Sequence, residues 1–70
     1  MYTVEYSATH LARRGRIVTD TGYLKTPSLG SAWRAGDTVW QRIGRRRGTT
    51  LEVRITDVEG NSTTRRYRRD

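Results

Sequence analysis

The chain has 70 residues, with 14 Lys and Arg against seven Asp and Glu, which gives a net charge of +7. A chain this short supports one marginal hydrophobic core, so we expect a single domain over residues 1–70. Because the sequence has no cysteine, neither a disulfide framework nor a thiolate metal site can stabilise it. A thin core favours association with a second chain, so a homodimer is one expectation.

The N-terminal segment has the period of a β-strand. Apolar and polar residues alternate over residues 2–9, which places Tyr2 and Tyr6 on one face with the other apolar side chains. The polar residues 10–15 indicate a loop, and the β-branched residues among 16–20 indicate an antiparallel return strand. We expect Gly22 to end this second strand, and residues 23–26 to cross to the next element.

The period changes to that of a helix in the middle of the chain. Apolar residues recur every three or four positions from Leu29 to Ile43, which predicts a helix over residues 27–44. Thr26 is the expected N-cap, with Pro27 at the first helical position. Two glycines inside this segment disfavour a helix. The alternative is a turn and strand over residues 35–40, which would produce a small SH3-like barrel.

The C-terminal third alternates again. Residues 51–56 predict a third strand, a turn follows at residues 59–61, and residues 62–69 predict a fourth strand with Tyr67 as its core residue. The order ββαββ defines the expected fold, an α+β domain in which one helix packs on one face of a four-stranded antiparallel sheet. On the helix, Trp33 and Trp40 fall on the apolar side and are expected in the core.

Ten of the thirteen arginines fall in three clusters. These clusters are Arg13, Arg14 and Arg16; Arg45, Arg46 and Arg47; and Arg65, Arg66, Arg68 and Arg69. The ββαββ order places all three at one end of the domain, and it places Asp20, Asp57 and Glu59 near the other end. A strongly cationic end predicts a partner rich in phosphate or carboxylate, because the guanidinium fork pairs well with both.

We therefore expect a non-enzymatic nucleic-acid-binding module that contacts phosphates, with DNA favoured over RNA and duplex DNA favoured among DNA forms. The exposed side of the helix and the loop after it are candidates for base readout. The helix-free sheet face lacks the pair of exposed aromatics that base-stacking sheets use, which disfavours single strands. The candidate binding residues are Arg13, Arg14, Arg16, Arg34, Gln41, Arg42, Arg45, Arg46, Arg47, Arg66 and Arg68.

The alternative function is a small phage- or plasmid-type interaction module or inhibitor that binds an acidic surface of a host protein. Arginine forks suit carboxylates and phosphates alike, so the sequence leaves both open.

Other classes of function find little support in the sequence. His10 is the one histidine and lies in the predicted loop, so we expect no metal site, no cofactor and no catalysis. No apolar run approaches the ~20 residues that span a bilayer, so no membrane contact and a cytoplasmic location are expected. Gly44 to Thr50 resembles a phosphate-binding loop but lacks its lysine and follows a helix.

Overall fold

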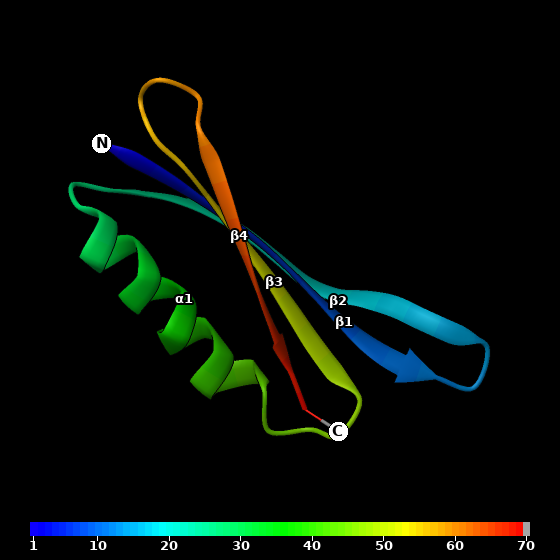
Figure 1. Ribbon diagram of the computed structural model, residues 1–70. Coiled ribbons are helices and arrows are strands. Elements are labelled where there is room, and N and C mark those ends of the chain that lie inside the picture. The colour runs from blue at the N-terminus through cyan, green and yellow to red at the C-terminus, as the bar shows by residue number, and fades with distance from the viewer. Residues whose placement is uncertain (70) are drawn as a thin grey trace.

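A computed structural model describes residues 1–69 as one antiparallel sheet with a single helix packed on one face (Figure 1). The elements are β1 (Tyr2–Ala12), β2 (Gly15–Thr26), α1 (Leu29–Ile43), β3 (Thr49–Thr56) and β4 (Ser62–Arg68). The strand order is β2-β1-β3-β4, which leaves β2 and β4 at the edges. The predicted α+β ββαββ fold is confirmed, and the helix over residues 29–43 excludes the barrel.

The first hairpin is longer than predicted. Residues 10–12 extend β1 and residues 21–26 extend β2, so the expected loop around His10 and the expected break at Gly22 are wrong. Gly22 stays in the strand because the ring of Tyr6, its cross-strand partner, occupies the space that a side chain would fill. A bulge between Ala8 and Thr9 shifts the register of the hairpin beyond this point.

The helix begins later than predicted, with Ser28 as its N-cap. The Ser28 side chain accepts a hydrogen bond from the Ser31 N–H at 3.1 Å. Thr26, the expected cap, is buried as the last residue of β2 and is paired with Tyr2. Its hydroxyl donates to the Ser28 carbonyl at 3.1 Å, so sheet pairing withholds Thr26 from the helix terminus.

The core lies between α1 and the two central strands. Its buried apolar residues are Val4, Ala8, Ala32, Val39, Leu51, Val53 and Ile55. Gly36 lets the helix approach the sheet closely, since a Cβ atom there would lie 3.2 Å from Cγ1 of Val53. The tyrosines and tryptophans expected in the core are partly buried against it, namely Tyr2, Tyr6, Tyr67, Trp33 and Trp40.

Aromatic contacts attach the exposed edge strand β4 to the helix. The rings of Tyr67 and Trp40 stack with centroids 5.4 Å apart, and the guanidinium of Arg65 lies 4.1 Å from the centroid of the Trp33 ring. The Tyr67 hydroxyl also donates a hydrogen bond to Asp37 on the helix. Side chains along one side of the helix, at positions 33, 37 and 40, therefore hold β4 in place.

Replacing glycine by alanine should have opposite effects at two positions. Gly22→Ala should destabilise the fold by roughly 1–3 kcal/mol, because the new methyl group overlaps the Tyr6 ring. Gly30→Ala, in the first turn of α1 with open space around it, should stabilise the fold by up to about 1 kcal/mol. Urea unfolding followed by circular dichroism measures both, and a Gly22→Ala variant as stable as the wild type would contradict the packing described.

The stability of the fold should depend on Tyr67 at alkaline pH. Burial, and then the hydrogen bond to Asp37, raise the pKa of Tyr67 above its ordinary value of 10.0. The native state thus favours the protonated phenol, so this contribution is present below about pH 10 and is lost as the pH rises through the native pKa. The stability difference between wild type and Tyr67→Phe should shrink over that range in urea titrations. A stability difference that stays constant over this pH range would rule out the link between Tyr67 ionisation and folding.

Candidate nucleic-acid interface

The three chain segments that carry the arginine clusters meet at Gly48. The Gly48 carbonyl accepts hydrogen bonds from the Leu11 N–H at 3.2 Å and from Nη1 of Arg16 at 3.1 Å. The Gly48 N–H donates to the carbonyl of Arg69 at 2.9 Å. Gly48 of the α1–β3 loop thus binds both the β1–β2 hairpin and the end of β4. The hydrogen bonds of its backbone bring together the three segments that carry the arginine clusters.

Further hydrogen bonds reinforce this junction from the C-terminal side. The Arg69 N–H donates to the Thr49 carbonyl at 3.0 Å, and Nε of Arg69 donates to the Gly44 carbonyl at 2.8 Å. Gly44 ends the helix, where carbonyl groups lack helical partners and attract cations. The guanidinium of Arg69 therefore ties the helix C-terminus to the last strand.

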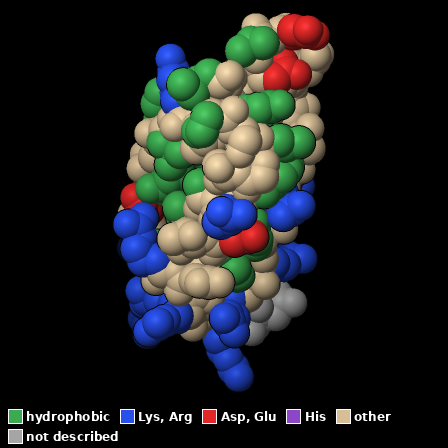
Figure 2. Space-filling model, turned by 90° about the vertical axis from the view of Figure 1, so that its left-hand side faces the viewer, with side chains coloured by type: hydrophobic (Ala, Val, Ile, Leu, Met, Phe, Trp, Pro, Cys, Tyr) green, Lys and Arg blue, Asp and Glu red, His purple; other side chains and the backbone are tan. Residues whose placement is uncertain are grey.

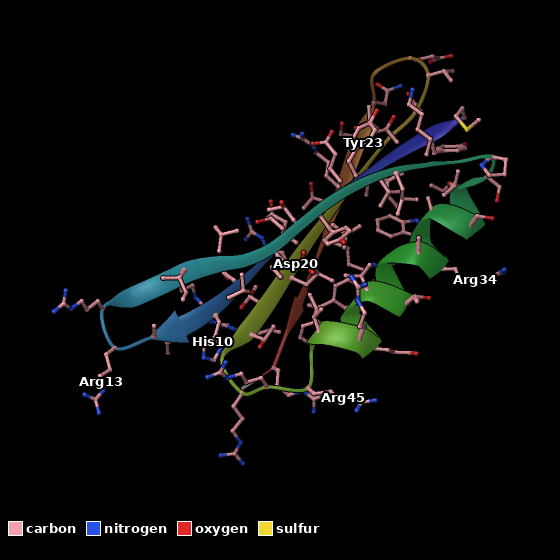
Figure 3. The ribbon with its side chains drawn as sticks, turned by 180° about the vertical axis from the view of Figure 1, so that it is seen from behind. His10, Arg13, Asp20, Tyr23, Arg34 and Arg45 are labelled. Carbon is pink, nitrogen blue, oxygen red and sulfur yellow. The ribbon has the colours of Figure 1, made fainter. Side chains whose placement is uncertain are left out.

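Arg13 and Arg14 form the tip of the β1–β2 hairpin. They connect the paired residues Ala12 and Gly15, and Gly15 has a φ of 117°, which side chains other than glycine rarely allow. Pairing of β1 with β3 ends at His10 and Thr49, so the hairpin projects beyond the end of β3. Figure 3 shows Arg13 at this projecting tip, directed away from the sheet.

We call the cationic end of the molecule the arginine pole. It comprises Arg13, Arg14, Arg16, Arg45, Arg46, Arg47, Arg68 and Arg69. Basic side chains gather at the lower end of Figure 2, which is also where the hairpin tip, the α1–β3 loop and the end of β4 lie in Figure 1. Arg13, Arg14, Arg45, Arg46 and Arg47 are exposed and form no ion pair with a carboxylate among residues 1–69.

The carboxylates of residues 1–69 lie elsewhere. Asp57 and Glu59 occupy the β3–β4 turn at the opposite end, as predicted, where the Asp57 side chain accepts from the Glu59 and Asn61 N–H groups at 2.9 Å. The placement of Asp20 at that end is wrong, because it lies in the middle of β2, 3.7 Å from Nη2 of Arg42. The other ion pairs within residues 1–69 are Arg54–Glu5, Arg65–Asp37 and Arg66–Glu52.

Several predicted binding residues lie outside the pole. Arg34 points away from the sheet on the far side of the helix (Figure 3), and Gln41 is exposed on the same helix. Arg42 contacts the sheet side, because its Nη2 also reaches the Tyr6 hydroxyl at 3.4 Å. The third cluster divides between the two faces of the sheet, since Arg65 lies over the Trp33 ring while Arg66 pairs with Glu52 on the other face.

The helix-free face of the sheet holds site features that the sequence interpretation missed. A cleft of about 570 Å³ there is lined by three predicted binding residues, Arg16, Arg66 and Arg68, together with Thr50, which was not predicted. Three exposed apolar side chains share this face with the cleft, namely Leu11, Val18 and Tyr23, with exposed fractions of 55%, 63% and 63%. The alternation of side chains between the two faces of β2 continues through Gly22, with one residue skipped at the bulge. Extending the second predicted strand in this way would have placed Val18 and Tyr23 on the helix-free face.

Comparison with protein-family models, with curated proteins and with solved structures gives no match to this chain. Within residues 1–69, no helix combines the length and the apolar character that crossing a membrane would require.

The junction predicts that Gly48 tolerates no side chain. Gly48 has a φ of 82°, and a Cβ atom there would lie 3.3 Å from Cβ of Leu11. Gly48→Ala should therefore destabilise the fold by about 1–3 kcal/mol. Gly60→Ala is the matched control, because Gly60 has a similar φ of 89° with open space around it. Thermal unfolding should show the larger loss for Gly48→Ala, and equal losses would contradict close packing at the junction.

Proposed function

We propose that the protein is a non-enzymatic, cytoplasmic nucleic-acid-binding module whose arginine pole engages the phosphates of duplex DNA. The observation that carries this proposal is the junction at Gly48, which brings the hairpin, the α1–β3 loop and the end of β4 together. A cluster of guanidinium groups that includes five with no carboxylate partner among residues 1–69 attracts a polyanion and binds it by releasing condensed counterions.

The uneven charge distribution supports a polyanionic partner. Ion pairs along the sheet and helix compensate Arg42, Arg54, Arg65 and Arg66, whereas five arginines of the pole have no carboxylate partner among residues 1–69. Like charges held close together oppose folding, because each raises the potential at its neighbours. Phosphates bound at the pole would offset that repulsion.

The shape of the pole favours a duplex over a single strand. The projecting β1–β2 hairpin is a two-stranded ribbon, an element that the major groove of B-DNA admits. The loop with Arg45, Arg46 and Arg47 lies beside the base of this ribbon, joined to it through Gly48. A ribbon in the groove, with Arg13 and Arg14 at its tip and the loop arginines on its β1 side, would place cations near the phosphate backbone.

Replacing Arg45, Arg46 and Arg47 together by alanine should weaken binding to duplex DNA by roughly tenfold or more, about 1.4 kcal/mol. If all three arginines contact phosphates, the slope of log K against log salt concentration should become shallower by roughly 2.7. Fluorescence anisotropy of a labelled duplex at several salt concentrations measures both quantities.

The matched control replaces the same three arginines by lysine. This variant keeps the charge, so it should retain most of the salt dependence while losing the forked geometry. Unchanged affinity and slope in the alanine variant would remove the loop from the interface. Weak binding by the wild type, together with stoichiometric capture of an acidic protein from nuclease-treated lysate, would favour the protein-interaction alternative.

A further inference from the structure

We infer that the cleft lined by Arg16, Thr50, Arg66 and Arg68 holds a backbone phosphate of the bound nucleic acid. This inference rests on the proposed function and adds to it a discrete site. It also assigns the contact to the helix-free face of the sheet, where Arg16 and Arg68 of the arginine pole lie with Arg66, instead of the exposed side of α1.

The sheet register brings the lining side chains to one face from both edges. Thr50 pairs with Thr9 on β1 and with Arg68 on β4, so these three side chains form one row across the sheet. Arg66 lies two residues away on β4, and Arg16 enters from β2. Long cationic side chains from the two edge strands thus approach over the central strands, which contribute the short side chain of Thr50 to the cleft.

Two of the arginines are held in place by contacts that leave donors available. Nη1 of Arg16 donates to the Gly48 carbonyl at 3.1 Å and to Oγ1 of Thr9 at 3.4 Å. Nε of Arg66 donates to Glu52 at 3.0 Å. Each contact uses one nitrogen of a guanidinium group that has three, so the others can donate to an anion. Such anchoring reduces the side-chain entropy lost when a phosphate binds.

The hydroxyl of Thr50 supplies an independent indication of a ligand. Its Oγ1 atom is buried beside the cleft and has no hydrogen-bond partner among residues 1–69. An unsatisfied buried hydroxyl costs about 1–3 kcal/mol, and donation to a phosphate oxygen would remove that cost. The arginines and the Thr50 hydroxyl would then donate to the same anion as groups of two kinds.

Charge favours this face over the helix surface. Among residues 1–69, three cations line the cleft and Glu52 borders it through its ion pair with Arg66, while Arg16 has no carboxylate partner there. On the helix side, Asp20 compensates Arg42, and the Trp33 ring and Asp37 engage Arg65. Leu11 and Val18, exposed beside the cleft, can pack against sugars or base edges once a strand is bound.

Two double variants that lose the same charge distinguish a phosphate site in the cleft from a general attraction between a cationic protein and DNA. Arg16→Gln with Arg66→Gln removes two cleft cations, whereas Lys25→Gln with Arg34→Gln removes two cations remote from the cleft. In anisotropy titrations with duplex DNA, the cleft variant should bind at least roughly tenfold more weakly, with a salt slope shallower by about 1.8. The remote variant should keep a slope close to that of the wild type. Equal losses in the two variants would overturn the cleft and leave the proposed function standing.

If the cleft variant fails to fold, a measurement on the wild-type protein tests whether the cleft binds phosphate. NMR titration of the wild type with inorganic phosphate should shift the Nε–H signals of Arg16 and Arg66 and the Thr50 amide signal in a saturable way. The Nε–H signal of Arg34 should stay in place. Absence of shifts, or shifts of equal size at Arg34, would overturn the site. A wild type that binds phosphate in the cleft but no duplex would instead remove the proposed function.

Discussion

The hydrogen bonds of Gly48 are the constraint on which the arrangement of this molecule depends. The carbonyl and N–H groups of this one residue join the β1–β2 hairpin to the end of β4, and the positive φ of Gly48 makes that geometry accessible. The energetic problem is that these segments carry the arginine clusters, whose charges repel one another. The backbone hydrogen bonds of Gly48 hold these segments together against the repulsion between their arginines. The positive charge that is concentrated there can bind an anionic partner.

The two faces of the sheet have different roles. One face packs against α1, and there the aromatic side chains of β4 and the helix compensate for a small aliphatic core. The other face is covered by no element of residues 1–69, and it combines ion pairs at mid-sheet with the cleft and exposed apolar side chains near the pole. Stability therefore depends on the helix side, which leaves the open face free to bind.

The fold could be predicted from the sequence because its signals are local. Alternation over residues 2–9 and 51–56 and the helical spacing after residue 28 determine the elements, and their order determines where the arginines converge. The errors come from contacts between distant residues. Gly22 stays in a strand because Tyr6 covers it, and Thr26 is kept from capping by its pairing with Tyr2. Asp20 lies in the middle of β2 because this strand continues to Thr26. The cleft was missed for the same reason, since its lining comes from β2, β3 and β4.

The most direct test of the central claim is the affinity of the wild-type protein for a labelled DNA duplex, measured over a range of salt concentrations with single-stranded DNA and duplex RNA as comparisons. If the arginine pole engages phosphates, duplex DNA should bind saturably at ~0.15 M salt and most tightly of the three, with a slope of roughly −4 or steeper for five or more phosphate contacts. Binding that is equally weak for all three and vanishes at that salt concentration would contradict the claim.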